Sequence, residues 1–308
     1  MSTLVTRRGF VQSLGAGAFC GLSLQGLDAK PKATRTHPWI PGKFRLNMRS
    51  CRKPVPKGLE YSPVHQVAEW HVSETAIVIC DMWAEHPCRM SQQRVGDMAP
   101  RMNEAISAAR DHGAFIVHAP SGGVDLYADT PFRKKMKEAV LVKSPIPITG
   151  HWDCDLKRET ELPVETRLRV EGGVRGCDDP KPRPYPKHDR HEHPAIGIVG
   201  WDGVSHSGQE MWNVFQREGI KNVILMGVHT NMCVLGRPFG IRMWAYLGMN
   251  VALCRDLTDS LYDPRDPPFV SHTRGTELIV QHIEKYWAPS FLARDLFQVA
   301  PGSNDPKN

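Results

Sequence analysis

The chain has 308 residues, of which 41% are hydrophobic and 23% charged, the balance of an ordinary globular protein with one large domain or two small ones. No apolar run reaches the length of a membrane-spanning helix, so no span is expected. The formal net charge of +6 arises mainly between residues 30 and 59, which hold nine Lys or Arg and no Asp or Glu; the body is mildly acidic, so nucleic-acid binding is not expected.

The first residues resemble a twin-arginine export signal. The motif positions are held by Thr6, Arg7, Arg8, Phe10 and Gln12. A weakly apolar stretch rich in Gly, Ala and Leu follows, and Ala29 is a small residue at which cleavage could occur. The alternative is a chance Arg-Arg pair. We expect residues 1–29 to be a signal peptide and the mature protein to reach the periplasm or another extracytoplasmic compartment.

Residues 30–73 form a basic arm that is rich in proline. This composition favours an extended segment that wraps over its own body or over a neighbouring subunit, and contact with a membrane surface is a further reading. We therefore expect a homo-oligomer.

From residue 74 the chain alternates between strand-like and helix-like segments. Short apolar, β-branched runs predict buried strands at 75–80, 114–120, 193–199, 222–227 and 250–256. Apolar residues at helical spacing predict helices at 101–113, 208–220, 234–248 and 276–287. Two glycines and a proline in "GRPFG" (236–240) predict that the third helix is kinked or delayed.

This alternation predicts a doubly wound α/β domain over residues 74–289, with a mostly parallel sheet and helices on both faces. Residues 290–308 form a C-terminal tail. One segment does not fit, because residues 143–194 contain eight prolines and show no sustained periodicity. So long an irregular insertion in a compact domain indicates a functional lid or an interface loop.

The cysteines carry limited information by their spacing. Removal of the signal would leave seven of the eight, so at least one thiol stays unpaired even in an oxidising compartment. The spacing matches no zinc pattern, and we expect neither a metal nor a cofactor. Pairing remains open among Cys51, Cys88, Cys154 and Cys177.

Polar side chains follow the predicted strands, at the end where ligands bind in an open parallel sheet. They are Asp81, Trp83, His86, His118, Asp202, His206, His229, Cys233 and Asp256. Asp81 and Cys233 follow strands that can be adjacent, so the carboxylate and the thiol can meet. A cysteine at the start of a helix is favoured as a thiolate, and the free N–H groups there can stabilise an oxyanion.

Three stretches, "AIVICDMW", "NVILMGVHTNMCVL" and "VALCRDLTDSLY", resemble the isochorismatase-like cysteine hydrolases, a superfamily that includes nicotinamidases and carbamoyl-amine amidases. The resemblance covers residues 74–289. It implies that a small amide or related carbonyl compound is cleaved through an acyl-enzyme, with Cys233 as nucleophile and Asp81 as general base. It also implies a cis peptide at Val228–His229 and an oxyanion hole formed by the backbone N–H groups of Met232 and Cys233.

The family also uses a lysine, at the end of the strand before the helix that leads to the nucleophile strand. In this chain Gly197 or Gly200 stands about where that lysine belongs. Other cations that could replace it are Arg237, Arg190, His118, His206, Lys143 and Lys187. The metal site of nicotinamidases is unmatched as well.

The candidate substrate-pocket residues are Trp83, His86, His118, His206 and Arg237. Each histidine could instead be a structural, hydrogen-bonded group, and Trp83 could belong to the core. Asp81 alone could be a solvated strand-end carboxylate, and Cys233 a buried core thiol. We expect "KHDRHEH" (187–193) to be a solvated loop rather than a metal site.

The missing lysine leaves two further functions open beside the hydrolase. One is an inactive relative of the family that binds a small ligand. The other is a structural subunit of an oligomer, held together by the basic arm.

Overall fold

The computed structural model describes residues 35–52 and 61–300. The predicted export signal, the first residues of the basic arm and residues 301–308 lie outside this range. Within it, no helix has the length and apolar character needed to cross a bilayer.

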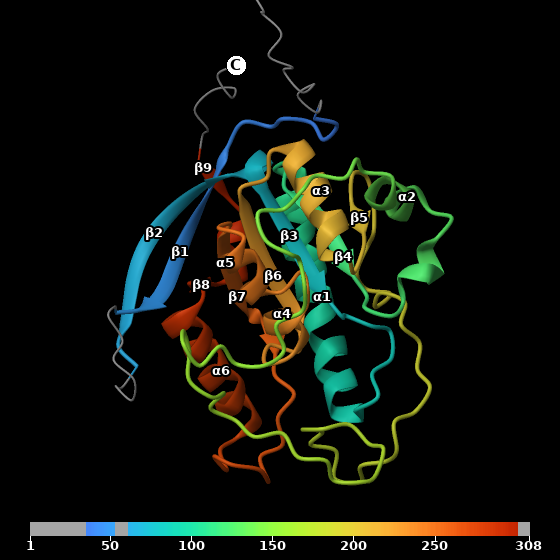
Figure 1. Cartoon of the computed structure of the whole chain (residues 1–308), viewed down its shortest axis with the longest axis vertical. Helices are drawn as coiled ribbons and strands as arrows, with labels where there is room; N and C mark the ends of the chain where they lie inside the picture. The colour runs from blue at the N-terminus through green and yellow to red at the C-terminus, as the bar shows by residue number, and fades with distance from the viewer. Residues whose placement is uncertain (1–34, 53–60, 301–308) are drawn as a thin grey trace, which may run out of the picture. The chain divides into compact units, whose positions relative to one another are not determined.

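One mixed sheet organises the described part of the chain (Figure 1). Its strand order is β2-β1-β8-β7-β6-β3-β4-β5, and β9 pairs with β1. The strands are β1 (Lys43–Cys51), β2 (Pro63–His71), β3 (Thr75–Cys80), β4 (Phe115–Ala119), β5 (Gly203–Val204), β6 (Asn222–Val228), β7 (Asn250–Asp259), β8 (Ser290–Phe291) and β9 (Val299–Ala300). Every pairing from β8 to β5 is parallel, whereas β1 pairs antiparallel with its neighbours.

Helices cover both faces of this sheet. They are α1 (Arg89–Asp111), α2 (Pro131–Lys137), α3 (Gly208–Glu218), α4 (Cys233–Gly236), α5 (Ile241–Tyr246) and α6 (His272–Tyr286), with 3-10 turns η1 (Val72–Glu74), η2 (Val124–Tyr127) and η3 (Ala293–Leu296). Apolar residues of α1 and η3 fill one core, and those of α3, α5 and α6 fill the other. The predicted doubly wound, mostly parallel α/β fold is therefore confirmed.

Strand β3 shows why both faces are apolar. Its alternate residues belong to different cores: Val78 and Cys80 lie in the cluster with α3 and α5, and Ile77 and Ile79 in the cluster with α1. All six residues of the strand are buried. A strand covered on both faces needs a continuous apolar run, which is what the sequence shows.

The strand order reverses direction at β3. From β3 the chain proceeds to β4 and β5 on one side and returns to β6, β7 and β8 on the other. Crossover helices leave on opposite faces at such a switch point, so a crevice opens at the carboxyl ends of β3 and β6. Asp81 follows β3 and Cys233 follows β6, so the topology brings this pair together.

The predicted strand at 193–199 is wrong. These residues form turns and irregular backbone, and the third parallel strand is the two-residue β5. Side chains take up the backbone groups of this segment: Asn103 accepts from the Gly197 N–H at 2.9 Å, and Asp202 from the Val199 N–H at 2.9 Å. Proline and glycine in the segment weaken strand pairing, so apolar content alone misled the prediction.

Three helices also differ from their predicted bounds, and one of them, α6, begins at His272 and not at 276. Helix α1 begins at Arg89, well before 101, and continues through Pro100. The proline ring of Pro100 faces the backbone of Gly96, four residues earlier in the helix. Buried residues lie along α1 both before and after Pro100, so packing against the sheet holds the helix on both sides of the proline. The segment 234–248 is divided into α4 and α5, as the prediction of a kinked or delayed helix anticipated.

The basic arm contributes strands that the sequence did not predict. Strands β1 and β2 form an antiparallel hairpin with a nine-residue register from Lys43 opposite His71 to Cys51 opposite Pro63. The hairpin lies at the left edge of the view in Figure 1. Residues Phe44, Leu46 and Met48 of β1 enter the core beneath it, which is why this strand is held.

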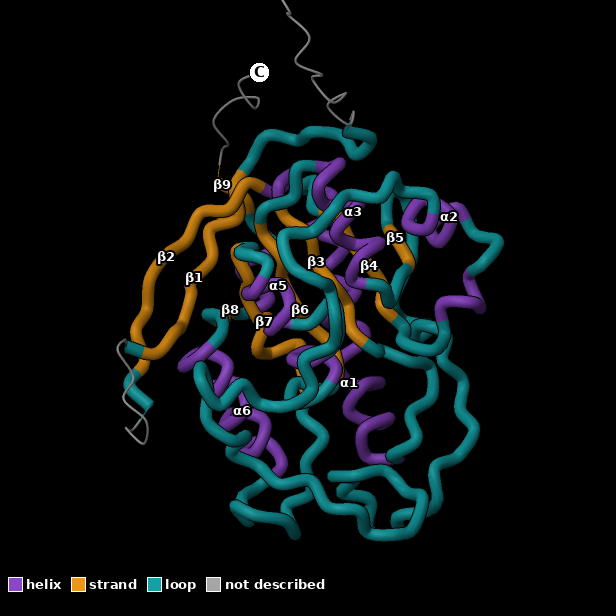
Figure 2. The backbone as a smooth tube through the Cα atoms, in the orientation of Figure 1, coloured by secondary structure: helices purple, strands orange, loops and turns teal. Residues whose placement is uncertain are grey.

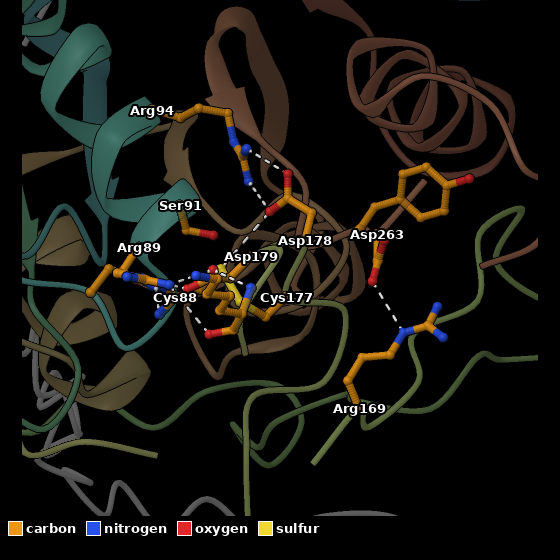
Figure 3. The surroundings of a disulfide bond; sticks show 12 residues. Cys88, Arg89, Ser91, Arg94, Arg169, Cys177, Asp178, Asp179 and Asp263 are labelled. Carbon is orange, nitrogen blue, oxygen red and sulfur yellow. Dashed lines mark hydrogen bonds and ion pairs between the residues drawn. A yellow bond between two sulfur atoms is a disulfide. The ribbon is translucent and has the colours of Figure 1, made fainter. Parts of the chain in front are cut away.

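The insertion 143–194 contains no helix and no ladder strand, as Figure 2 shows. It is nevertheless tied to the domain at two places along its length. Near its middle, Glu159 is fully buried against Arg242 and His282. Toward its end, a disulfide joins Cys177 to Cys88, immediately before α1 (Figure 3).

Candidate active site

Asp81 occupies the carboxyl end of β3 in a strained backbone position. Its φ is +49°, a left-handed value that is uncommon for a residue other than glycine. The Ser121 N–H donates to Oδ1 at 2.7 Å, and the residue is only 2% exposed. Burial raises the pKa of Asp81, and Arg237, Cys233 and Ser121 offset part of that rise. A buried carboxylate of raised pKa accepts a proton readily, which suits a general base.

Cys233 is the first residue of α4 and is half-buried. The strand before it passes so close to β3 that a Cβ at Gly227 would meet the Cys80 carbonyl oxygen at 2.1 Å, and the φ of Gly227 is +99°. Only glycine fits there. This close approach of backbones sets the distance between the Asp81 and Cys233 segments.

The residues between β6 and Cys233 are held by the end of β7. Thr230 Oγ1 lies 2.8 Å from Thr258 Oγ1, and the Thr230 N–H donates to the Asp259 carbonyl at 2.9 Å. The Asn231 side chain makes two bonds with the backbone of Leu261, both at 2.9 Å. Thr and Asn therefore stand before the cysteine because they fix the loop that presents it.

The peptide bond between Val228 and His229 is cis, at the position that the family resemblance implies. The two expected oxyanion donors differ in their surroundings. The Met232 N–H donates to the His229 carbonyl at 2.9 Å and is therefore engaged in this conformation. The Cys233 N–H begins α4 and has no intrahelical acceptor, and no backbone acceptor for it is found among the described residues.

Among the described residues, Arg237 is the cation that forms an ion pair with Asp81. Its Nη2 lies 4.0 Å from Asp81 Oδ2, an oxygen that has no hydrogen-bond partner of good geometry among the described residues. Burial tends to lower the pKa of Arg237, but the charges of Cys233 and Asp81 outweigh it and raise that pKa. The guanidinium thus stays charged beside Asp81 and Cys233.

The end of the strand before α3 is occupied by Ser205 and His206, because this strand is β5. The placement of Gly197 or Gly200 at that strand end is corrected accordingly. Ser205 Oγ donates to Glu210 at 2.5 Å, and His206 is exposed and accepts from the Gly122 N–H at 3.2 Å. No lysine stands at this strand end.

The other candidate cations lie elsewhere. Arg190 sits 5.5 Å over the Trp83 ring and donates to His188, and Lys143 and Lys187 are exposed. His118 is buried between two carboxylates and not beside Cys233. Position therefore separates Arg237 from the alternatives.

Trp83 and His86 belong to an aromatic group that extends from the site toward the insertion. Their rings stack at 5.6 Å, His229 meets His86 edge-on at 4.7 Å, and His188 lies 5.1 Å from Trp83. Burial, with further lowering by His229 and His188, brings the pKa of His86 to about 2. Burial likewise lowers the pKa of His229 to about 4. Both imidazoles are therefore neutral near pH 7 and, with pKa values this low, weak proton acceptors.

His118 pairs with Asp202 at 3.2 Å and with Glu192 at 3.6 Å, and all three are buried. Although burial lowers it, these two carboxylates raise the pKa of His118 to about 9. Burial raises the pKa of Glu192, and the nearby Asp81 charge adds to the rise. Glu192 was missed in the sequence because it lies in a loop; its one signal was membership of the polar run 187–193.

The end of the insertion closes over the strand ends. Trp83 and Glu192 form a bridge, and the Ala84 N–H donates to the His191 carbonyl at 2.8 Å. A pocket of about 800 Å³ lies outside this cover, lined by Glu85, Gly122, Asp125, Leu126, Tyr185, Pro186, Lys187, His188, Asp189 and Arg190. Neither Asp81 nor Cys233 lines it, but Gly122 follows the Ser121 that binds Asp81. The end of the insertion therefore lies between Asp81 and Cys233 and the outer pocket.

The disulfide Cys88–Cys177 settles a pairing that spacing left open, and Cys51 and Cys154 are free. Ion pairs flank the disulfide: Arg94 contacts Asp178 at 2.9 Å, and Arg89 contacts Asp179 at 2.6 Å (Figure 3). The second half of the insertion is thereby fixed to the start of α1. Within the described ranges, no group of three or more His, Cys, Asp or Glu could hold a metal ion.

No protein-family model and no curated protein matches this sequence. Solved structures do show similarity. A cysteine hydrolase from Pseudomonas syringae pv. phaseolicola is similar with a TM-score of 0.44 and 13% identity, over 80% of this chain and 95% of that one. An isochorismatase family protein from Burkholderia thailandensis gives 0.40 and 17%, over 72% and 93%.

N-carbamoylsarcosine amidase from Thermoplasma acidophilum is similar with a TM-score of 0.37 and 12% identity, over 71% of this chain and 96% of that one. At these scores and identities the likenesses carry no argument about chemistry. The function must be inferred from the residues of the site.

Proposed function

We propose that this chain is an exported cysteine hydrolase of the isochorismatase-like superfamily that cleaves a small amide or a related carbonyl C–N bond. The observation that carries the proposal is the meeting of three groups at the switch point of the sheet: the Cys233 thiol, the buried Asp81 carboxylate and the Arg237 guanidinium. A nucleophile, a base and a cation are what this reaction requires.

The reaction proceeds in two halves. Asp81 takes the thiol proton of Cys233, and the sulfur attacks the substrate carbonyl carbon to give a tetrahedral oxyanion that the Cys233 N–H can bind. The C–N bond then breaks, and the amine leaves with the proton that Asp81 held. Water, deprotonated by Asp81, attacks the thioester and releases the acid, which restores the thiol.

The buried cover over the site fits a small substrate. Asp81 is 2% exposed, so a substrate must be enclosed or must enter as the end of the insertion shifts. The rings of Trp83 and His86 stack on each other and would offer flat, uncharged faces to such a substrate. A closed site of this kind excludes bulk water and favours small planar compounds such as amides over polymers.

An inactive ligand-binding relative is less well supported. That reading was motivated by the missing lysine, and a cation within reach of Asp81 and Cys233 weighs against it. Arg237 is such a cation.

The proposal is tested with purified protein and a panel of small primary amides and carbamoyl compounds. Iodoacetamide should label Cys233 before the other free thiols, as peptide mass spectrometry can show. Cys233→Ala should lower turnover at least about a thousandfold, and Asp81→Asn to a similar extent. Cys154→Ala is the matched control, since that thiol is free and half-buried but away from Asp81, and it should keep its activity.

The same preparation, expressed with its full N-terminus in a host that has the export route, should lack residues 1–29 by intact mass. No turnover of any amide, together with an unreactive Cys233, would overturn the proposal. Retention of residues 1–29 would overturn export alone.

A further inference from the structure

Arg237 comes from the same turn of chain as the nucleophile. It follows Cys233 by four residues, caps the end of α4, and its N–H donates to the Cys233 carbonyl at 3.2 Å. Residues four apart on one helical turn lie on the same side. The guanidinium is therefore presented to the site by the segment that carries the thiol, and not by a neighbouring strand.

The donors of the Arg237 guanidinium are not saturated by hydrogen bonds, although the group lies beside a carboxylate. Nη2 is 4.0 Å from the unpartnered Asp81 Oδ2, and the side chain is about one third exposed, at 32%. Its Nε is buried and has no hydrogen-bond partner among the described residues. A structural arginine would saturate these donors, as Arg94 does with Asp178 and Asp259.

The insertion holds Arg237 in place from the other side. The Trp152 ring lies 5.0 Å from Arg237 Cζ, within range for a cation–π contact. The neighbouring His151 N–H donates to the Gly236 carbonyl at 2.7 Å. A Cβ at Gly236 would meet the His151 carbonyl oxygen at 2.8 Å, so this approach needs a glycine directly before the arginine.

This contact is itself anchored in the core. Arg242 donates to the His151 carbonyl at 2.8 Å and pairs with buried Glu159 at 2.8 Å. The chain from Glu159 through Arg242 to residues 151 and 152 therefore fixes the wall against which Arg237 rests. An insertion that is irregular in backbone thus has a defined place at the site.

We infer that Arg237 is the cation of this active site in place of the family's lysine, that it favours Cys233 as the thiolate and orients Asp81, and that Trp152 is its positioning residue. The inference rests on the proposed function. It assigns to the insertion 143–194 a part in the chemistry that a surface loop would not have. Arg237 touches the reacting groups, whereas Trp152 acts only through Arg237.

An arginine in place of a lysine has a chemical consequence for proton transfer. A guanidinium does not lose its proton in the range in which proteins are stable, so it cannot serve as an acid for the leaving amine. Every proton transfer then passes through Asp81. The cation also remains at alkaline pH, where a lysine in a buried site could become neutral.

The test needs no substrate. The rate at which iodoacetamide alkylates Cys233 is measured against pH by peptide mass spectrometry, in the full chain and in Arg237→Gln, Arg237→Lys and Trp152→Ala. Arg237→Gln should slow alkylation at pH 7 about tenfold or more and move the midpoint of the rate–pH curve upward, because the cation beside the thiolate is lost. Arg237→Lys should restore much of the rate, which a purely structural role would not predict.

Trp152→Ala should give an intermediate loss, since the charge remains but is less well placed. The matched control is Arg158→Gln, which should leave the rate–pH curve unchanged. Arg158 is an exposed arginine of the same insertion, and its guanidinium lies 4.0 Å from the centre of the Trp287 ring. A reactive Cys233 with identical curves in the wild type and Arg237→Gln would overturn this inference and leave the proposed function standing. A Cys233 that is unreactive at every pH in the wild type would overturn both.

Discussion

Two glutamates of the insertion, Glu159 and Glu192, are buried almost equally, at 1% and 6% exposure, but their surroundings differ. Around Glu159, His282 Nε2 and Trp287 Nε1 each lie at 2.7 Å and Arg242 at 2.8 Å. Burial alone would raise its pKa, yet these donors lower the pKa of Glu159 to about 2. The carboxylate is ionised and satisfied.

Glu192 faces a single imidazole. Neither of its oxygens has a hydrogen bond of good geometry among the described residues, and His118 Nδ1 is 3.6 Å away. Burial therefore prevails and the pKa of Glu192 is raised. The comparison shows that the number of donors, and not the depth of burial, decides whether a buried carboxylate stabilises the fold.

The largest expected effect is the loss of the satisfied carboxylate. Glu159→Ala leaves Arg242 buried without its partner and should lower the free energy of unfolding by about 3–5 kcal/mol. Denaturant unfolding monitored by circular dichroism measures the change. Glu161→Ala, an exposed position two residues away, should stay within about 0.5 kcal/mol of the wild type. Equal stabilities of the two variants would remove the distinction between the two buried carboxylates.

The second effect concerns the disulfide Cys88–Cys177. It holds the half of the insertion that contains Glu192, whereas the half that contains Glu159 has no disulfide. Cys88→Ser combined with Cys177→Ser should lower the free energy of unfolding by about 2–4 kcal/mol, because the crosslink joins residues 89 positions apart and restricts the unfolded chain. Unfolding with and without a reductant measures it: the reductant should destabilise the wild type and leave the double variant unchanged. A reductant effect in the double variant would mean that another disulfide forms.

The smallest expected effect is that of the unsatisfied carboxylate. Because the pKa of Glu192 is raised in the fold, its ionised form costs stability at neutral pH. Glu192→Gln should therefore be as stable as the wild type at pH 7, or more stable by up to about 1 kcal/mol.

The direction in which stability changes with pH distinguishes Glu192 from Glu159. As pH falls through the raised pKa of Glu192 toward its unfolded value near 4.5, the wild type should gain stability relative to Glu192→Gln, and the difference should level off below that value. For Glu159 the opposite holds: its contribution is present above 4.5 and is lost as pH falls toward 2. Glu171→Gln, exposed on the same insertion, is the control. A Glu192→Gln variant that behaves like a Glu159 variant would contradict the comparison.

Much of the central sheet could be predicted from sequence because its strands are buried on both faces. The runs at 75–80 and 222–227 each have one polar residue, Thr75 or Asn222, and it stands at the first position of the run; both runs are strands. The run at 193–199 is also rich in apolar residues, but it joins no ladder of the sheet: Asn103 and Asp202 accept from backbone N–H groups of this run instead. Apolar content records burial, and only the tertiary partner decides between a strand and a buried loop.

The amino-acid sequence by itself placed the two groups that we propose to react. It fixed a carboxylate after one strand and a thiol after another, and a glycine at 227 that lets the two backbones meet. It could not determine the cation. Six candidates lay along the chain, and a charge becomes a catalytic partner through its distance to other groups, which depends on the whole fold.

Only the tertiary structure distinguishes Arg237 among these candidates, because it places Arg237 4.0 Å from Asp81 and beside the Trp152 ring; our proposal that Arg237 is the cation rests on these contacts. The tertiary structure also determines how the insertion is held. Its irregular backbone shows no periodic pattern in the sequence from which this could be predicted. Long-range donors to Glu159 and the disulfide at Cys177 hold it. Local patterns determine elements, whereas charge, burial and pairing between distant residues determine what a site contains.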